Sequence, residues 1–426
     1  MKNINSEINI ERVTPGDGQF FFGYYDLSPE SPDGTKILCN KAPFIDRMPR
    51  AADELEIGYI DARTFEYTVI GKTSAWNFQE GCRLQWLDDE RVIYNIRDGH
   101  TFKSEVFDVV QRCSIRIYDI PIYSVAKGFA LSYSFTNNKY DYAHTEDEWS
   151  QDPYKDGVYL LNLANGTYNR IISNDTLDSF AGIKNSNGHV EYCVFNPKGD
   201  KFYLYYRWGD RWGENNNAAY TMVCVSDLNG NVTVLLKSNF ISHAGWCGNE
   251  KISAWGRLPN RVNAVQNNSF FRNTGLWKIA VSVFHHIVKS SKYRQKLTND
   301  AYIMMDLISG DKYKIENSCF TSDGHCTWSS DEALMLTDTY PDKNDRRHLM
   351  IYDMSNDKVY LLGMFYSYPE KMKEKNVSWN FSAMRCDLHP KWGRRKKYIY
   401  FDSVHEGYRG LYRIDISNRL EDNSGE

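Results

Sequence analysis

The chain has 426 residues and a formal net charge of −4, so its overall field would not attract nucleic acid, and we expect no nucleic-acid role. It contains 30 Tyr, 21 Phe and 11 Trp against only 12 Pro, which indicates an ordered protein built from strands. It has no run of about 18 apolar residues, and residues 1–13 lack the apolar centre of a secretory signal. The nine scattered cysteines form no C-x-x-C pair, so we expect a cytoplasmic protein with reduced thiols.

A unit of four short strands recurs along the chain. Its first half is a strand, a polar turn and an apolar strand, and its second half contains a strand that ends in Asp or Asn near a turn. The first halves are residues 24–39, 82–96, 120–135, 192–206, 243–255, 325–337 and 389–401. The matching second halves contain residues 58–61, 106–108, 158–162, 224–227, 303–306, 350–353 and 411–415.

Four antiparallel strands in each of seven repeats predict an all-β protein, a seven-bladed β-propeller that forms a single domain over residues 1–426. The last repeat lacks a clear fourth strand, and residues 8–13 are expected to supply it and so close the ring. A pair of β-sandwiches is the alternative, because alternation alone does not separate the two folds. The seven copies in phase favour the propeller.

Residues 258–299 interrupt the fifth blade, and we expect them to form a helical insertion. Within it, residues 275–296 carry apolar side chains at spacings of three and four, with lysine and arginine on the remainder. Packed on the propeller, this helix would be a lid, and lying on a bilayer it would make a peripheral membrane contact. A third interpretation is that its apolar stripe simply packs on the body of the protein.

Three histidines occupy the same place in successive repeats. His243, His325 and His389 each precede a tryptophan by three residues, which puts them on the innermost strands of blades five, six and seven, facing one another near the axis. Three imidazoles with an open position are typical of a divalent transition-metal site, such as Mn²⁺ or Zn²⁺. Asp323 and Asp387, two residues before a histidine, are candidate ligands or partners of the ligands. A metal-free catalytic or sugar-binding cluster and a purely structural role are the alternatives.

Other polar and aromatic side chains are expected at the same mouth of the channel. Tyr192 is the blade-four counterpart of the histidines, with His189 three residues earlier. Asp338, after a second strand, is expected to be a turn residue, and the loop 77–81 is expected to approach the channel. The sequence has no G-x-S-x-G elbow, phosphate-binding glycine loop or dinucleotide fingerprint, which argues against serine hydrolases, kinases and Rossmann enzymes.

The turns Ser31-Pro32-Asp33-Gly34 and Trp328-Ser329-Ser330-Asp331 resemble those of the TolB-type propeller repeat. With its histidine-bearing strands, the chain is similar to the oligogalacturonate lyase type of seven-bladed propeller. Members of that family bind Mn²⁺ through channel histidines and a glutamine, and they cleave uronate-containing oligosaccharides by β-elimination. The clustered glutamine and two histidines of the lyases are not present here, so only one histidine per blade carries over.

The resemblance implies a metal-dependent, lyase-like enzyme that acts on an acidic oligosaccharide or polysaccharide. The metal ligands would be His243, His325 and His389. The catalytic residues would be His189 as the base and Tyr192 as the acid, helped by Arg207. The substrate would be bound by Arg257, Trp208 and Tyr340. Arg207 could equally stack on an aromatic face. The alternative function is a non-catalytic propeller that binds a saccharide or a protein during surface-polysaccharide metabolism.

Overall fold

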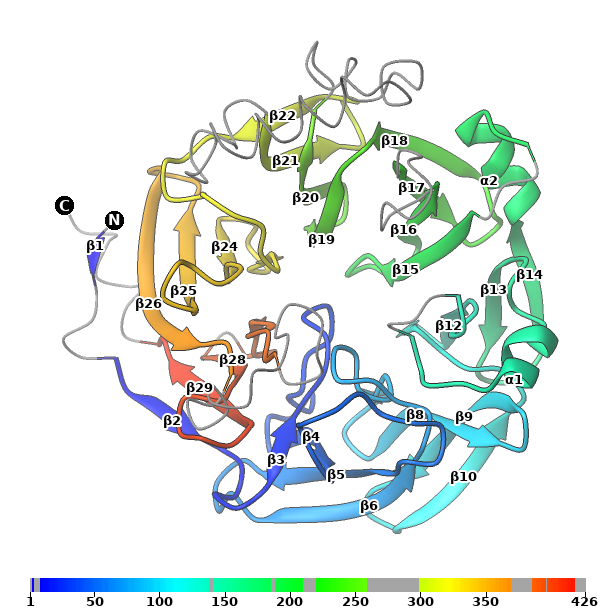
Figure 1. Ribbon diagram of the computed structural model, residues 1–426, viewed down its shortest axis with the longest axis horizontal. Coiled ribbons are helices and arrows are strands. Elements are labelled where there is room, and N and C mark those ends of the chain that lie inside the picture. Colours follow the sequence, from blue (N-terminus) through cyan, green and yellow to red (C-terminus); the bar gives the residue numbers. More distant parts are fainter. Residues whose placement is uncertain are drawn as a thin grey trace, which may run out of the picture.

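Seven sheets stand around a central axis in the computed structural model, so the predicted all-β seven-bladed propeller is confirmed (Figure 1). The structure describes residues 2–3, 8–137, 141–184, 188–209, 220–258, 299–368, 385–395 and 397–417. Within these residues, two short helices interrupt the strands, α1 (Glu146–Gln151) and α2 (Asn174–Ala181), and Figure 1 shows both at the outside of the ring.

In the first five blades the strands follow chain order from the axis outwards, and neighbouring strands are antiparallel. Blade one contains β3 (Gln19–Phe21), β4 (Lys36–Ala42), β5 (Leu55–Asp61) and β6 (Tyr67–Thr73), and blade two contains β7 (Gln85–Trp86), β8 (Arg91–Asp98), β9 (Thr101–Asp108) and β10 (Cys113–Tyr118). Blade three contains β11 (Ser124–Ala126), β12 (Phe129–Ser132), β13 (Gly157–Asn162) and β14 (Tyr168–Ser173), and blade four contains β15 (His189–Phe195), β16 (Lys201–Trp208), β17 (Tyr220–Asp227) and β18 (Val232–Ser238). Blade five contains β19 (Ile241–Cys247), β20 (Lys251–Arg257), β21 (Asp300–Asp306) and β22 (Lys312–Ile315).

The two ends of the described chain complete the last two blades. Blade six contains β23 (Thr327–Trp328), β24 (Leu334–Thr337), β25 (Arg346–Asp353) and β26 (Lys358–Tyr366), with β1 (Lys2–Asn3) added outside in parallel. Blade seven contains β27 (Lys391–Trp392), β28 (Tyr398–Ser403) and β29 (Gly410–Asp415), and its outer strand is β2 (Ile10–Arg12). Because β2 pairs antiparallel with β29, the ring closes through the N-terminal stretch, as predicted.

The middle strands of a blade have neighbours on both faces, which explains their continuous apolar sequence. In β16, residues 202–207 are all buried. The tryptophan of each histidine repeat then joins its blade to the preceding one, because its indole N–H donates a hydrogen bond across the gap. The three bonds run from Trp246 Nε1 to the Val194 carbonyl at 2.9 Å, from Trp328 Nε1 to Ser253 Oγ at 2.8 Å and from Trp392 Nε1 to the Thr327 carbonyl at 3.4 Å.

The predicted helix at residues 275–296 lies outside the described residues, as does most of the insertion 258–299. Its helical form, its role as a lid and its membrane contact therefore stay predictions. None of the helices in the described part of the chain is long and apolar enough to span a membrane.

Candidate active site in the central channel

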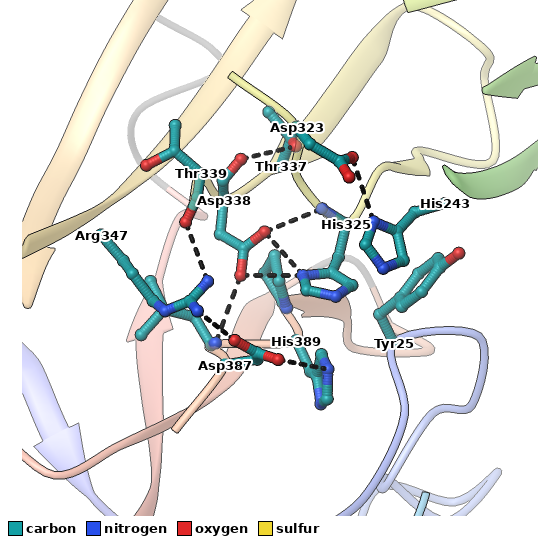
Figure 2. A network of polar contacts seen from close by, with 12 residues as sticks. Tyr25, His243, Asp323, His325, Thr337, Asp338, Thr339, Arg347, Asp387 and His389 are labelled. Carbon is teal, nitrogen blue, oxygen red and sulfur yellow. Dashed lines mark hydrogen bonds and ion pairs between the residues drawn. The ribbon is translucent and has the colours of Figure 1, made fainter. Parts of the chain in front are cut away.

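The three predicted histidines come together near the axis (Figure 2). The ring centroids of His243 and His325 are 4.0 Å apart, and those of His325 and His389 are 4.4 Å apart. All three side chains are buried. His243 lies in β19, whereas His325 and His389 lie just before the short inner strands β23 and β27. Equivalent positions in successive blades thus place imidazoles from three blades in one buried cluster.

Each imidazole is oriented by an acceptor at its Nδ1 atom. The pairs are His243 Nδ1 with Asp323 Oδ1 at 3.1 Å, His325 Nδ1 with Asp338 Oδ1 at 2.8 Å, and His389 Nδ1 with the Gly23 carbonyl oxygen at 3.1 Å. A carbonyl oxygen or an ionised carboxylate only accepts, so a neutral ring carries its hydrogen on Nδ1 and keeps its lone pair on Nε2. The three Nε2 atoms are therefore the ones able to bind a cation or accept a proton.

Asp338 was expected to be a turn residue, but its carboxylate also orients groups in two blades. Its carboxylate also accepts the backbone N–H of His325 at 2.7 Å and that of Leu388 at 3.2 Å, so it links blades six and seven. Burial alone would raise the pKa of Asp338, but the neighbouring His325 and Arg347 bring that pKa below its usual value. The carboxylate stays ionised and fixes His325.

Two equivalent residues in the channel have left-handed backbone conformations. His389 has φ of 42° and its blade-four counterpart Tyr192 has φ of 58°. This region is costly for residues with a side chain, and it persists only where the surrounding structure enforces it. Both side chains face the ring of Tyr24. Its ring centroid is 4.9 Å from that of His389 and 5.6 Å from that of Tyr192.

Among the described residues, His325, Asp387 and His389 form a group whose ligand atoms all lie within 4.8 Å of one another. Asp387 takes the place in this group that the sequence analysis assigned to His243, which lies beside His325. Burial, together with the charge of His325, lowers the pKa of His243 and lowers that of His389 strongly. Neutral imidazoles at neutral pH are the form that ligates metals.

Two arginines surround Asp387. Arg347 Nη2 pairs with Asp387 Oδ1, and Arg385 Nη2 donates to Asp387 Oδ2 at 3.1 Å. Burial opposes the charge of Asp387, yet the two guanidinium groups hold its pKa well below the usual value. Neither arginine was predicted from the sequence. Arg385 could have been proposed from its place two residues before Asp387, since residues two apart face the same way in an extended segment.

Two tyrosines, neither of which was predicted from the sequence, cover the histidines. The Tyr25 ring centroid is 5.1 Å from that of His325, and its hydroxyl donates to the Ala244 carbonyl at 2.8 Å. Tyr24 donates from its hydroxyl to Tyr192 Oη at 3.0 Å. Burial raises the pKa of Tyr24 and Tyr25 well above the usual value, so both hydroxyls stay protonated.

The loop 77–81 approaches the same tyrosines and presents Glu80. The Glu80 carbonyl oxygen packs so closely on Gly23 that a Cβ there would lie 2.9 Å from it. Tyr123 donates from its hydroxyl to Glu80 Oε1 at 3.1 Å. Burial raises the pKa of Glu80 to about 7, although the nearby Arg83, which pairs with Asp26, opposes the shift. Glu80 can therefore exchange a proton near neutral pH.

The predicted catalytic residues of blade four form a chain of polar contacts. His189 Nε2 lies 3.1 Å from Glu191 Oε1, and Glu191 Oε2 pairs with Arg207 Nε at 2.6 Å. Arg207 also donates to Thr221 Oγ1 and to the Ile241 carbonyl, which joins blades four and five. These contacts orient the ring of His189 and hold Arg207 inside the protein.

The predicted substrate-binding residues separate into two groups. The ring of Tyr340 is 6.0 Å from that of His243, so the structure brings it to the cluster. Arg257 pairs with Asp300 at 2.6 Å, and Trp208 stacks on Tyr220 with a centroid distance of 5.5 Å. Arg257 and Trp208 are the last residues of β20 and β16, and these contacts are not with the three histidines.

No protein-family model matches the chain, and no curated protein matches it. Among solved structures, it is similar to an oligogalacturonate lyase in complex with manganese, with 12% identity over 97% of this chain and 95% of that chain and a TM-score of 0.43. It is also similar to TolB from Acinetobacter baumannii, with 12% identity over 86% and 78% of the two chains and a TM-score of 0.40. A prolyl endopeptidase matches with 8% identity over 93% of this chain and 47% of that chain, at a TM-score of 0.50. Propellers of the oligogalacturonate lyase and TolB types are thus among its structural neighbours, as expected, and these identities show the fold alone.

Proposed function

We propose that this propeller is a divalent-metal-dependent enzyme that cleaves uronate-containing oligosaccharides by β-elimination. One observation carries the proposal: His389 Nε2 is buried and has no hydrogen-bond partner among the described residues, although it lies 4.0 Å from Asp387 Oδ2 and beside His325. A buried polar atom without a partner costs about 1 to 3 kcal/mol. A cation bound between these side chains would satisfy it.

The residues in the cluster fit such a cation. Imidazole nitrogen and carboxylate oxygen are ligands that Mn²⁺ and Zn²⁺ both accept. His325, Asp387 and His389 would hold it, with His243 as the predicted further ligand, and the acceptors at the three Nδ1 atoms would keep the rings oriented. When bound, the cation would neutralise the uronate carboxylate and so acidify the proton on the adjacent C5.

The chain's own residues would move the protons. In β-elimination a base takes the proton from C5, the bond from C4 to the glycosidic oxygen breaks as the C4–C5 double bond forms, and the departing oxygen receives a proton. We assign His189 as the base, because Glu191 orients it, and Tyr192 as the acid, because it lies in the aromatic wall of the channel. Glu80 is a third group able to give a proton at neutral pH.

The test follows ultraviolet absorbance of the unsaturated product. The purified protein is incubated with oligogalacturonides as purified, after chelation, and after Mn²⁺ is restored. We expect absorbance to rise, to stop after chelation and to return with Mn²⁺, and we expect no product from His325→Ala. His100→Ala is the matched control, because His100 is exposed in the turn between β8 and β9. Saccharide binding with no product would instead support the non-catalytic alternative, and a full rate after chelation would remove the metal from the proposal.

A further inference from the structure

Arg385 and the buried imidazole of His389 both lie near the carboxylate of Asp387. Its Nη2 donates to Asp387 Oδ2 at 3.1 Å, and the same oxygen lies 4.0 Å from His389 Nε2. The guanidinium carbon of Arg385 is 5.2 Å from the ring centroid of Tyr340, and that ring is 6.0 Å from the ring of His243. Arg385 therefore lies at the edge of the histidine cluster, beside the ring of Tyr340.

Arg347, the other arginine on Asp387, shows by contrast what is unusual about Arg385. The side chain of Arg347 is 0% exposed, and its guanidinium pairs with Asp387 and donates to the Thr339 carbonyl (Figure 2). It also donates to Ser367 Oγ. The side chain of Arg385 is 26% exposed, and within the described part of the chain its guanidinium contacts Asp387 and Tyr340, with which it shares a hydrogen bond as well as a contact over the ring. A guanidinium has five N–H donors, more than these contacts use.

The charges of this trio favour an anion. Asp387 is one carboxylate shared by two guanidinium groups, and the ionised Asp338 also lies near the charge of Arg347. Arg347 is buried, so the positive charge that a ligand can reach is that of Arg385, whose carboxylate partner is shared with Arg347. Arginine stays charged at every physiological pH, and its planar fork matches both oxygens of a carboxylate.

We propose that Arg385 binds the carboxylate of the uronate substrate, with Tyr340 as the wall against which the sugar ring packs. Asp387 positions the guanidinium, so that the acidic group of the sugar would lie next to the histidine cluster. This assignment rests on the proposed function and names the residue that distinguishes an acidic sugar from a neutral one.

Calorimetric titration with D-galacturonate and with D-galactose tests the assignment. The two sugars differ only in the carboxylate at C6, and chelator is present throughout so that no cation can bind that group. The variants are Arg385→Gln, Arg385→Lys and the control Arg346→Gln, whose guanidinium faces Tyr366 Oη at 3.2 Å. Thermal unfolding of each variant shows whether it folds.

We expect the wild type and Arg346→Gln to prefer galacturonate, and Arg385→Gln to bind it about tenfold or more weakly while galactose binding stays the same. Arg385→Lys keeps the positive charge but loses the planar pair of N–H donors, so we expect an intermediate affinity for galacturonate. If Arg385→Gln does not fold, Arg385→Lys replaces it in the test. Equal binding of galacturonate by the wild type and the Arg385 variants, or no preference of the wild type for galacturonate, overturns the assignment. A preference lost in Arg385→Gln, in a protein that forms no unsaturated product, would overturn the proposed β-elimination and leave the assignment standing.

Discussion

The two halves of the channel present different chemistry near one axis. Blades five to seven contribute His243, His325 and His389, each held by an acceptor at Nδ1. Blades one to four contribute hydroxyl and carboxyl groups, among them Tyr24 and Glu80. Radial symmetry brings both sets of side chains to one axis, and the identity of these side chains decides whether each half can bind a cation or transfer a proton. The histidine half offers the lone pairs of the predicted metal ligands, and the tyrosine half offers protons together with His189, the proposed base.

Burial acts on the two halves in opposite directions and with the same result. It lowers the pKa of His243 and His389, and it raises the pKa of Tyr24, Tyr25 and Glu80. Removing water disfavours whichever form is charged, so bases become harder to protonate and acids harder to ionise. The fixed charges of the channel include arginine–aspartate pairs such as Arg83 with Asp26 and the carboxylate of Asp338.

The largest expected effect comes from His389→Ala, which removes the imidazole with the unpaired Nε2. We expect metal affinity to fall by more than about 100-fold, because even an outer partner of a ligand is worth about 10- to 100-fold. Elemental analysis after dialysis against a metal buffer measures the change. Wild-type metal content in this variant would show that the histidine half is no metal site.

Asp338→Asn tests whether the acceptors at Nδ1 matter. The amide keeps the shape but not the charge that orients His325, so we expect metal affinity to fall by about 10- to 100-fold. Tyr123→Phe removes a hydrogen bond in the tyrosine half and should leave metal affinity unchanged. Equal losses in the two variants would contradict the division between the halves.

Glu80→Gln tests the tyrosine half through pH. The folded protein keeps the Glu80 proton up to about pH 7, whereas the usual pKa is 4.5, so between these values the folded state binds more protons than the unfolded one. The stability of the wild type therefore falls as pH rises from about 4.5 to 7, and Glu80→Gln should lack this component. We expect its melting temperature, relative to wild type, to rise by about 1 to 3 °C across the window. The control Glu90→Gln, at an exposed carboxyl, should follow wild type.

The smallest effect compares two tryptophans that join neighbouring blades. Trp328→Phe removes the bond to Ser253 Oγ beside the histidines, and Trp86→Phe removes the bond to the Pro29 carbonyl in the other half. Each lost hydrogen bond should cost about 1 kcal/mol of unfolding free energy, measured by denaturant titration. Only Trp328→Phe should also weaken metal binding, because Trp328 lies three residues after His325. Weakening by both would show that ring stability in general, not local position, controls the site.

The periodic features of the fold could be predicted from the sequence. The strand pattern repeats in phase, which was enough to predict seven blades and the closing strand β2. Repetition also put the three histidines in one column, since equivalent positions of a propeller lie at the same distance from the axis. Arg385 could have been proposed from its place two residues before Asp387.

Contacts between different parts of the repeat could not be predicted from the sequence. Asp323 was predicted from its spacing to act near the cluster, but its partner is His243 in the neighbouring blade. Asp338 looked like a turn residue, and its role comes from the packing of blade six against blade seven. Tyr24 and Glu80 carry no motif, because they reach the channel from loops whose path depends on close packing, as between Gly23 and the Glu80 carbonyl.

The amino-acid order alone determined which elements form and which residues share an angular position, because both follow from local periodicity and from the symmetry of the repeat. Only the tertiary structure decided which acceptor orients each imidazole, that Asp387 joins His325 and His389, and that Arg347 is enclosed while Arg385 is open. The physical reason is that hydrogen bonds, ion pairs and burial depend on distances between blades, and those distances arise only when the ring closes.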